Sequence, residues 1–280
     1  MLILNGQLVS ESSAEATILN RGFKYGDALF ETIRVYQKQI PLLTLHLDRL
    51  IRGMYVMKYD FHEGDFRRMM KQELYKAIAV NEIENHAKLR LQVYRAGEGT
   101  YTPLQKSPRF IIETYALRND PFQQSRPISL GSFQEYELSK HPLSGIKTVN
   151  ATIYILAGLH AMESGVDESL LYHQGKIAET HISNLFLVKQ KKLITPPLET
   201  GCLDGVMRRK LMELCLTLSV PVEERLFKDS LIKQADEVFV TNSIKGIVPV
   251  DEFQNIRWDI SRCTMIPFLR RCLEQYVLSV

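Results

Sequence analysis

The sequence has no long hydrophobic run, no Cys-x-x-Cys pair and only one tryptophan among its 280 residues. A membrane-spanning helix needs about 20 consecutive apolar residues, and no stretch comes close to that length. Residues 1–6 show no basic region followed by an apolar run, so we expect neither a signal peptide nor a membrane anchor. The sequence therefore favours a cytoplasmic protein.

Cysteine is scarce, and its spacing excludes the common metal and disulfide frameworks. The four cysteines are Cys202, Cys215, Cys263 and Cys272, and no cluster of histidines accompanies them. Structural zinc sites draw on closely spaced cysteine and histidine ligands. We therefore expect four reduced thiols and no metal site.

Neither sign of charge is in large excess. The 35 lysines and arginines and 32 aspartates and glutamates leave a formal net charge of +3, and the two signs are interspersed. A nucleic-acid-binding surface normally concentrates positive charge, so the composition gives no reason to expect nucleic acid as a partner. The 45% content of hydrophobic residues is sufficient for a large core, and the length favours two modest domains over one.

The N-terminal part of the chain reads as an α/β domain over residues 1–117. Asn5-Gly6 sits between two short apolar runs, which is typical of a β-hairpin whose first strand begins at residue 2. The hydrophobic periodicity further predicts a glycine-bracketed loop at 21–27, a strand at 28–35, a turn at 36–39, helices at 45–50 and 63–80, and paired strands at 88–95 and 110–115.

A polar segment with two prolines, residues 118–127, predicts an interdomain linker, and residues 128–280 then form the C-terminal domain. In this domain residues 175–184 are expected to lie between two strands. The pattern predicts strands at 128–135, 168–172 and 185–188, a hairpin turn at 191–192, a strand from 237, and helices at 153–162 and 266–276. Residues 201–211 are expected to carry a glycine loop into a further long amphipathic helix.

The stretch with the clearest chemistry is 144–151, where Lys147 lies between a Ser-Gly pair and the start of a helical pattern. We interpret Lys147 as the residue that anchors an aldehyde cofactor. A lysine amine has an ordinary pKa of about 10.4, which must fall before the amine can hold a Schiff base near neutrality. The alternative is an exposed lysine at a junction between a loop and a helix, which is the usual place for this residue type.

Four further places could bind an anion. Arg49 lies early on a predicted helix, and its planar set of donors suits a phosphate, although such arginines are usually solvated. The glycines of 201–205 lead into a helix whose first N–H groups could bind a phosphate. The hydroxyl and amide groups of 241–243 could do the same or could cap their own turn. Arg95, next to the glycine-rich loop 96–103, could hold a substrate carboxylate.

In their order and spacing, these motifs resemble the class IV aminotransferases, which bind pyridoxal 5'-phosphate in the arrangement called fold type IV. The resemblance covers nearly the whole chain. It is carried by Phe23-Lys24-Tyr25-Gly26-Asp27 with Leu29-Phe30-Glu31-Thr32, by His46-Leu47-Asp48-Arg49-Leu50, by Gly145-Ile146-Lys147-Thr148-Val149-Asn150, by Ala178-Glu179-Thr180 with Ser183-Asn184-Leu185-Phe186, by Gly205-Val206-Met207-Arg208, and by Thr241-Asn242-Ser243.

The resemblance implies a small N-terminal α/β domain, a larger C-terminal pseudo-barrel domain, the cofactor in the cleft between them, and a homodimer. Lys147 would form the Schiff base and move the proton at the substrate carbon, and Glu179 would keep the pyridine nitrogen protonated. The phosphate would be held by Arg49, the backbone donors of Val206 and Met207, and Asn242 or Ser243. Candidates for substrate contacts are Arg95, Tyr101 and Thr32.

The resemblance is nearest to the lyase that releases pyruvate from aminodeoxychorismate and leaves 4-aminobenzoate for folate synthesis. Aminotransferases acting on branched-chain or D-amino acids are the alternatives, and a pyridoxal-phosphate-binding protein without turnover is a remote one. The tyrosine that the branched-chain enzymes carry shortly after the lysine has no match in 148–152. The loop 97–101 lacks both the arginine of many lyases and the basic pair of the D-amino acid enzymes, and Ala28 stands where a glycine is common.

Overall fold

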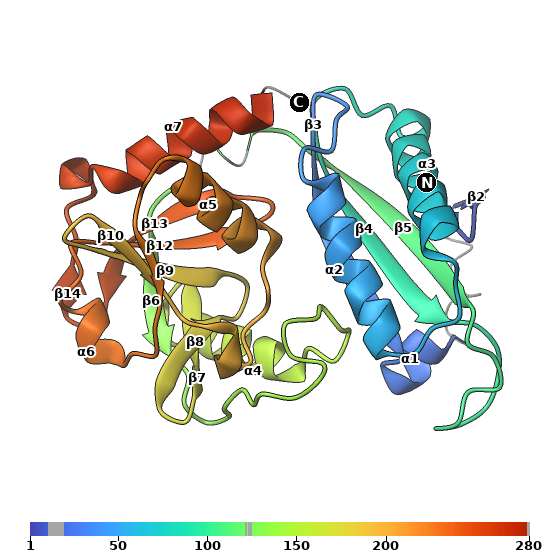
Figure 1. Ribbon diagram of the computed structural model, residues 1–280, viewed down its shortest axis with the longest axis horizontal. Helices are drawn as coiled ribbons and strands as arrows, with labels where there is room; N and C mark the ends of the chain where they lie inside the picture. Colours follow the sequence, from blue (N-terminus) through green and yellow to red (C-terminus); the bar gives the residue numbers. More distant parts are fainter. Residues whose placement is uncertain (11–19, 121, 123–124, 279–280) are drawn as a thin grey trace. The chain divides into compact units, whose positions relative to one another are not determined.

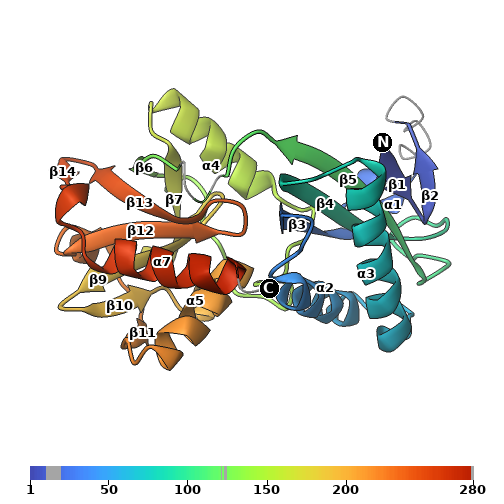
Figure 2. The same ribbon diagram turned by 90° about the horizontal axis from the view of Figure 1, so that it is seen from above.

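The computed structural model describes residues 1–10, 20–120, 122 and 125–278, which form two compact units (Figures 1 and 2). The N-terminal unit comprises residues 1–120 and 146–150, and the C-terminal unit comprises 121–145 and 151–280. The change of unit after Asp120 falls inside the predicted linker, of which Pro121, Gln123 and Gln124 lie outside the described residues. Residues 146–150, which the sequence assigned to the C-terminal domain, instead belong to the N-terminal unit.

The N-terminal unit is built on a five-stranded antiparallel sheet with strand order β2-β1-β5-β4-β3. Helices α2 and α3 pack on one face of it. Its elements in chain order are β1 (Leu2–Leu4), β2 (Gln7–Val9), α1 (Arg21–Tyr25), β3 (Ala28–Tyr36), α2 (Leu43–Val56), α3 (Glu63–Val80), β4 (His86–Arg95) and β5 (Pro108–Leu117).

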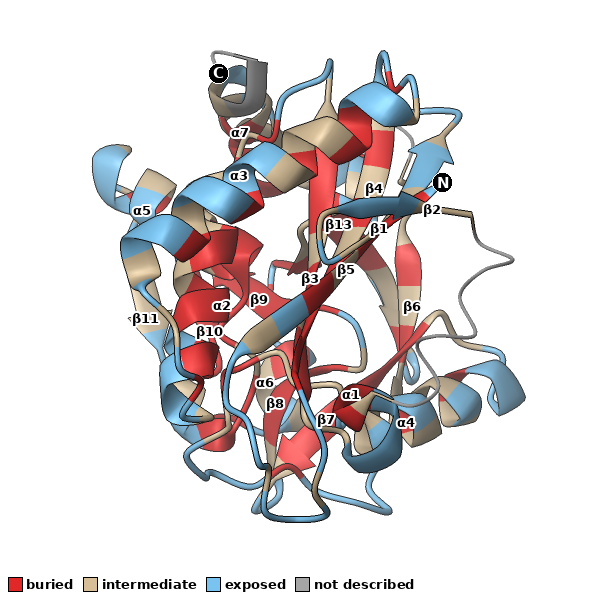
Figure 3. Ribbon diagram, turned by 90° about the vertical axis from the view of Figure 1, so that its right-hand side faces the viewer, coloured by how far each residue is buried: buried red, intermediate tan, exposed pale blue. Residues whose placement is uncertain are grey.

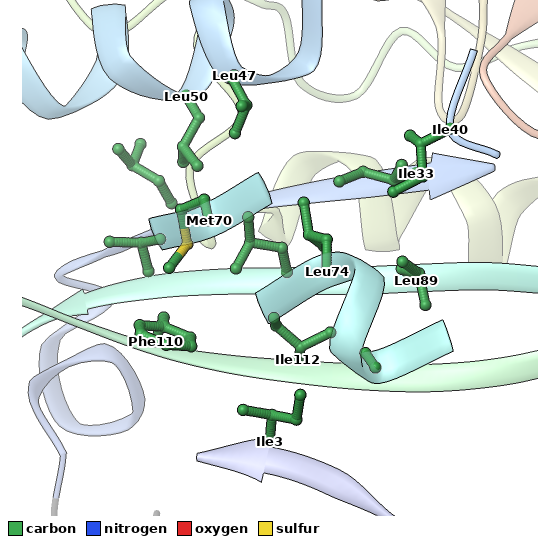
Figure 4. Close-up of a cluster of buried hydrophobic side chains, with 14 of the residues drawn as sticks. Ile3, Ile33, Ile40, Leu47, Leu50, Met70, Leu74, Leu89, Phe110 and Ile112 are labelled. Carbon is green, nitrogen blue, oxygen red and sulfur yellow. The ribbon is translucent and has the colours of Figure 1, made fainter. Parts of the chain in front are cut away.

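Strand alternation sorts the side chains of this sheet onto two faces. On β3, Leu29, Ile33 and Val35 face the helices and join the hydrophobic core, because side chains two residues apart share a face. Figure 4 shows the result, with side chains of α2 and α3 pointing toward those of β3, β4 and β5. Phe30 and Thr32 consequently lie on the opposite face of the sheet.

The predicted hairpin and strands are confirmed here, and the predicted helix at 63–80 coincides with α3. The predicted loop at 21–27 is wrong in one respect, because residues 21–25 form helix α1. Asn20 caps its first turn by accepting a hydrogen bond from Phe23 N at 2.8 Å. Gly26 ends the helix with φ at 66°, and a Cβ there would lie 2.3 Å from Asn150 Oδ1.

The C-terminal unit contains a nine-stranded sheet in the order β11-β10-β9-β12-β13-β6-β7-β8, with β14 paired to β13. Although β8 and β9 are not neighbours in this order, they lie in contact, so the sheet curls toward itself. Its elements are β6 (Ile128–Ser132), α4 (Thr152–Glu163), β7 (Glu168–His173), β8 (Lys176–Thr180), β9 (Asn184–Lys189), β10 (Lys192–Thr195), η2 (Leu198–Thr200), α5 (Val206–Thr217), β11 (Val222–Glu224), α6 (Asp229–Ile232), β12 (Glu237–Asn242), β13 (Gly246–Phe253), β14 (Ile256–Arg257), η3 (Ile260–Arg262) and α7 (Met265–Leu278).

Helices α5 and α7 contact each other and both pack against β12, while α4 packs against β7. Figure 3 shows that buried residues concentrate on the strands, whereas α3, α4 and α5 expose their outer faces. The carboxylate of Glu237 accepts hydrogen bonds from the first N–H groups of α7, including that of Ile266 at 2.8 Å, and so fixes where this helix begins. Among the described residues, no helix is long and apolar enough to cross a membrane.

Candidate active site

Lys147 is held in place by pairing of its own backbone with the start of β3. Phe30 N donates to Lys147 O at 2.9 Å, Val149 N donates to Ala28 O at 3.1 Å, and Leu29 and Thr148 form an isolated bridge. These contacts explain why residues 146–150 belong to the N-terminal unit. They fix the backbone from Lys147 to Val149, so the lysine sits on a rigid support.

The amine of Lys147 lies over the ring of Phe30, with Nζ 4.5 Å from the ring centroid. Arg90 also contacts this ring, because its Cζ lies 4.3 Å from the same centroid. Both contacts are within the range of a cation–π interaction. The sequence did not indicate Arg90 as a site residue. In the structure its guanidinium and the amine of Lys147 both contact the ring of Phe30.

Further cations share the sheet face that carries Phe30. The register pairs Thr32 with Arg90 and Arg34 with Lys88, and directly opposite residues of an antiparallel pair project to the same face. Two acids lie nearby, since Arg90 Nε is 3.3 Å from an oxygen of Glu113 and Arg34 pairs with Asp120. Positive groups remain in excess, so the face is suited to an anionic ligand.

Arg49 lies on the opposite face of the sheet, in a buried cluster with Glu31 and His46. Arg49 Nε donates to Glu31 Oε1 at 2.8 Å, and His46 Nδ1 lies 2.7 Å from Glu31 Oε2. Burial by itself would raise the pKa of Glu31, but the charge of Arg49 and the hydrogen bonds from His46 and Arg49 outweigh it and lower this pKa to about 2. Burial lowers the pKa of His46, so a neutral imidazole donates its Nδ1 hydrogen to the carboxylate.

The low pKa of Glu31 predicts how the stability of the N-terminal unit depends on pH. The pKa in the folded state is about 2 and the ordinary value is 4.5, so below pH 4.5 the unfolded chain binds the proton more readily. Stability that Glu31 supplies above pH 4.5 should therefore be lost as the pH falls toward 2. Urea unfolding at a series of pH values should show this loss in the native protein, and Glu31→Gln should lack that part of the pH dependence.

The structure gives Arg95 a structural role in place of the predicted contact with a substrate carboxylate. Its Nε donates to Asp27 Oδ2 at 3.0 Å, its Nη2 donates to Met57 O at 2.6 Å, and its guanidinium stacks on Tyr59. The side chain is buried, so these partners account for its position. Tyr101, by contrast, is 91% exposed and packs against the ring of Tyr25.

In the C-terminal unit, Glu179 is a buried carboxylate with three donors arranged around it. Tyr154 Oη donates to Oε1 at 2.8 Å, Leu203 N donates to the same oxygen at 2.9 Å, and Asn184 Nδ2 donates to Oε2 at 3.1 Å. Burial, and secondarily the carboxylate itself, raise the pKa of Tyr154, so this hydroxyl stays protonated. The donors hold the carboxylate in a single orientation.

The start of α5 lies beside this carboxylate. Gly205 is its N-cap residue, and no side chain caps the helix, whose first two residues are Val206 and Met207. A Cβ on Gly205 would come within 1.9 Å of Asn184 Oδ1, so only glycine allows Asn184 to reach Glu179. The N–H groups of a helix start form an anion site when nothing else caps them.

The turn after β12 is the other predicted anion site. Asn242 Oδ1 accepts hydrogen bonds from Ile244 N at 3.1 Å and Lys245 N at 2.9 Å, which fixes the backbone around Ser243. Of the residues predicted from the sequence, the N-terminal unit thus contains Lys147, Arg49, Arg95, Tyr101 and Thr32, and the C-terminal unit contains Glu179, Val206, Met207, Asn242 and Ser243.

The chain is similar in sequence and in fold to known enzymes. Residues 28–253 match the family described as amino-transferase class IV. The chain is 26% identical to the D-alanine aminotransferase of Bacillus licheniformis over 253 residues, covering 89% of this chain and 87% of that protein. Among solved structures, the 4-amino-4-deoxychorismate lyase of Pseudomonas aeruginosa has a TM-score of 0.82 and 28% identity over 98% of both chains.

The branched-chain aminotransferase of Thermoproteus uzoniensis has a TM-score of 0.86 at 21% identity, with 99% of this chain and 94% of that chain covered. These structures share the mixed α/β fold with a curled sheet described above. The family model spans far more than half of the sequence. The chain therefore belongs to the class IV aminotransferase family and is a pyridoxal-phosphate-dependent enzyme of fold type IV.

Proposed function

We propose that the chain is a 4-amino-4-deoxychorismate lyase, which releases pyruvate and leaves 4-aminobenzoate, a precursor for folate. The observation that carries this proposal is the cationic sheet face of the N-terminal unit, where Lys147 and Arg90 contact the ring of Phe30 and Lys88 follows on the same face. Aminodeoxychorismate carries two carboxylates, and fixed cations beside the reactive lysine suit such a substrate.

Each unit contains groups of the kind that pyridoxal phosphate requires. The N-terminal unit would contribute Lys147 for the aldehyde and Arg49 for the phosphate, because the cluster of Arg49, Glu31 and His46 is near enough to Lys147 for the lysine charge to help lower the pKa of His46. The C-terminal unit would contribute the buried carboxylate of Glu179 for the pyridine nitrogen. It would also contribute N–H groups at the start of α5, which no side chain caps, and the turn at Asn242 and Ser243 for the phosphate. These groups supply an amine, an acid and several anion-binding donors, which is the set that the cofactor needs.

Lys147 is the residue that would move the proton. When bound, the cofactor withdraws electrons from the substrate carbon that carries the amine. Lys147 Nζ would take the proton from this carbon, and the C–O bond between the ring and the enolpyruvyl ether would then break to give the aromatic product. The enolpyruvate that leaves would take up a proton and become pyruvate. Glu179 would hold the proton on the pyridine nitrogen, and Arg90 would orient a substrate carboxylate.

An aminotransferase acting on branched-chain or D-amino acids is the second candidate, because the acceptor 2-oxoglutarate also carries two carboxylates. One observation counts against each of these aminotransferases, although the loop in the second also lacks the arginine of many lyases. Residues 148–152 contain no tyrosine of the kind found in the branched-chain enzymes. Residues 96–103 contain no lysine or arginine, and the adjacent Arg95 is bound to Asp27 and Met57 O, so the basic pair typical of the D-amino acid enzymes is missing.

The deciding experiment incubates the holoenzyme with aminodeoxychorismate in one reaction, and with an amino acid and 2-oxoglutarate in another. Pyruvate and 4-aminobenzoate in the first reaction would support the lyase. Glutamate in the second reaction, with no product in the first, would assign the aminotransferase instead. A yellow protein with no product in either would be a cofactor-binding protein without turnover.

Arg90→Met tests the proposed substrate contact. A hydrogen bond to a charged group contributes about 1.5–3 kcal/mol, so KM for aminodeoxychorismate should rise by about 10–100-fold while the bound cofactor is retained. Initial rates over a range of substrate concentrations would measure the change. Arg257→Met is the matched control, because Arg257 is exposed on β14 and pairs with Glu252 of the adjacent β13. A KM that stays within twofold of the native value would remove Arg90 from the proposed site.

We also propose that the enzyme is a homodimer, supported by an apolar stripe on α4. Ile155, Leu159 and Met162 are 62%, 45% and 70% exposed and follow the spacing of one helix face. Exposed apolar side chains grouped in this way usually mark an interaction surface. A two-fold symmetric contact with a second copy would cover them.

Leu159→Glu should therefore shift the protein from dimer to monomer, because a carboxylate buried in such a contact would lose its hydration. Light scattering coupled to size-exclusion chromatography measures the mass directly. Leu216→Glu is the control, since Leu216 is 83% exposed on α5 and lies outside the stripe. A monomeric native protein, or a dimer that persists in Leu159→Glu, would reject the proposed surface.

A further inference from the structure

The C-terminal unit buries another carboxylate besides that of Glu179. Glu168, the first residue of β7, is only 2% exposed. Its Oε2 accepts a hydrogen bond from Thr180 Oγ1 at 2.5 Å, and its Oε1 accepts one from Ser183 Oγ at 3.3 Å. Within the described part of the chain, its hydrogen bonds come from hydroxyl groups and from no lysine, arginine or histidine.

Burial of such a carboxylate is energetically unfavourable. Loss of hydration raises the pKa of Glu168, and the two hydroxyls and the more distant Lys245 offset this only in part. An apolar side chain of similar size would fill the same space without this penalty. A carboxylate at this position is explained if its hydrogen bonds fix the conformation of neighbouring residues.

The hydrogen bonds of Glu168 lead to the turn after β12. Asn242 Nδ2 donates to Ser183 Oγ at 3.1 Å, and Ser183 Oγ is the group that donates to Glu168. A serine hydroxyl has a single hydrogen, so a serine that donates to Glu168 must present a lone pair to its other neighbour. The amide nitrogen of Asn242 is therefore directed at Ser183.

The orientation of this amide decides the shape of the turn. With Nδ2 directed at Ser183, Oδ1 of Asn242 is left to accept from Ile244 N and Lys245 N. Reversal of the amide would place its NH₂ group against these two N–H donors. The backbone around Ser243 thus depends on a chain of hydrogen bonds that begins at Glu168.

We propose that Glu168 is a positioning residue for the cofactor phosphate, acting through Ser183 and Asn242 on the turn that carries Ser243. The inference rests on the proposed function, in which that turn contacts the phosphate. It assigns Glu168 no contact with the cofactor. Replacement of Glu168 should therefore weaken the binding of a ligand that has the phosphate and leave the binding of a ligand that lacks it unchanged.

The test compares two ligands, pyridoxal phosphate and pyridoxal, in equilibrium titrations of the cofactor-free full-length protein followed by absorbance. Glu168→Leu removes both acceptor oxygens, and Ser183→Ala cuts the link while leaving Glu168 in place. For each variant, Kd for pyridoxal phosphate should rise about tenfold, which corresponds to one lost hydrogen bond of ordinary strength, and Kd for pyridoxal should not change. The double variant should be no weaker than either single variant, because both act in one chain.

Tyr172→Phe is the matched control. Tyr172 is buried on the same strand and donates its hydroxyl to Asp229 Oδ1 at 3.0 Å, so this variant also removes a hydrogen bond between a hydroxyl and a carboxylate. Its Kd for both ligands should match the native value. Thermal unfolding of the cofactor-free variants should show that Glu168→Leu remains folded.

Two results would overturn the inference alone: unchanged binding of pyridoxal phosphate in both variants, or equal weakening of pyridoxal phosphate and pyridoxal, which would indicate a general structural effect. A native protein that binds neither ligand would overturn the proposed function and this inference with it. The outcomes therefore separate a failure of the positioning role from a failure of the site.

Discussion

Replacing Lys147 with alanine should leave a folded protein that is colourless and catalytically inactive. The amine is the group that would both bind the cofactor aldehyde and move the proton at the substrate carbon. Positioned proton transfer alone contributes on the order of 10²–10⁴ to a rate, so kcat for pyruvate release should fall by at least that factor. The visible absorbance of the purified protein and the rate of 4-aminobenzoate formation measure the two effects separately.

Two variants show whether the amine itself is responsible. Lys147→Arg keeps a positive charge near the ring of Phe30 but offers no amine, so it should be as inactive as the alanine variant. Lys88→Ala removes another cation of the same sheet face, and it should keep the yellow colour. Retention of colour and turnover in Lys147→Ala would contradict the assignment of this lysine.

Much of the fold could be predicted because its signals are local. The helix at 63–80 carries an apolar stripe at helical spacing, and the strands at 88–95 and 110–115 alternate clearly, so their periods alone identify them. Strand β8 was missed, since Lys176–Thr180 is only five residues long and its neighbours in sequence are mostly turn-forming. The predicted segment between strands at 175–184 is therefore corrected to a strand followed by a turn, and Glu179 lies within that strand.

The candidate site was harder to predict because its contacts join distant parts of the chain. Arg95 looked available beside a glycine-rich loop, yet its partner Asp27 is 68 residues away and no local pattern links the two. Arg90 looked like one polar residue of an alternating strand. Arg90 lies near Lys147 only because the bridge between Leu29 and Thr148 brings residues 146–150 onto the sheet of the N-terminal unit.

Residue types, however, were informative where the chemistry needs a particular group. Lysine in the Gly-Ile-Lys motif predicted an amine for the cofactor aldehyde, and glutamate in the Ala-Glu-Thr motif predicted an acid for the pyridine nitrogen. Sequence could not show that Glu179 would be buried with three donors around it, because Tyr154, Asn184 and Leu203 come from three separate elements or loops. The one feature of the sequence that bears on this environment is Gly205, whose lack of a side chain leaves space for Asn184 to reach Glu179.

Replacing Glu179 with glutamine should give the other large effect, a fall in kcat on the order of 10²–10³, which is the usual result of removing one group that stabilises charge in a transition state. Glutamine has nearly the same shape, and its amide oxygen can still accept from Tyr154 Oη and Leu203 N, which both bind Oε1. It carries no negative charge, so it would not keep the pyridine nitrogen protonated. Steady-state rates with aminodeoxychorismate measure the loss, and the phosphate donors should still retain the cofactor.

Tyr154→Phe separates the charge of Glu179 from the hydrogen bonds that hold it. This variant removes the donor 2.8 Å from Oε1 but leaves the carboxylate, Asn184 and Leu203 N in place. Because the carboxylate keeps its charge and two of its donors, the lost hydrogen bond acts on kcat only through the position of Glu179, so kcat should fall by about tenfold or less, well short of the effect of Glu179→Gln. If both variants lost activity equally, orientation of the carboxylate would matter more than its charge. If Glu179→Gln stayed within tenfold of the native rate, Glu179 would have no part in the proposed electron withdrawal.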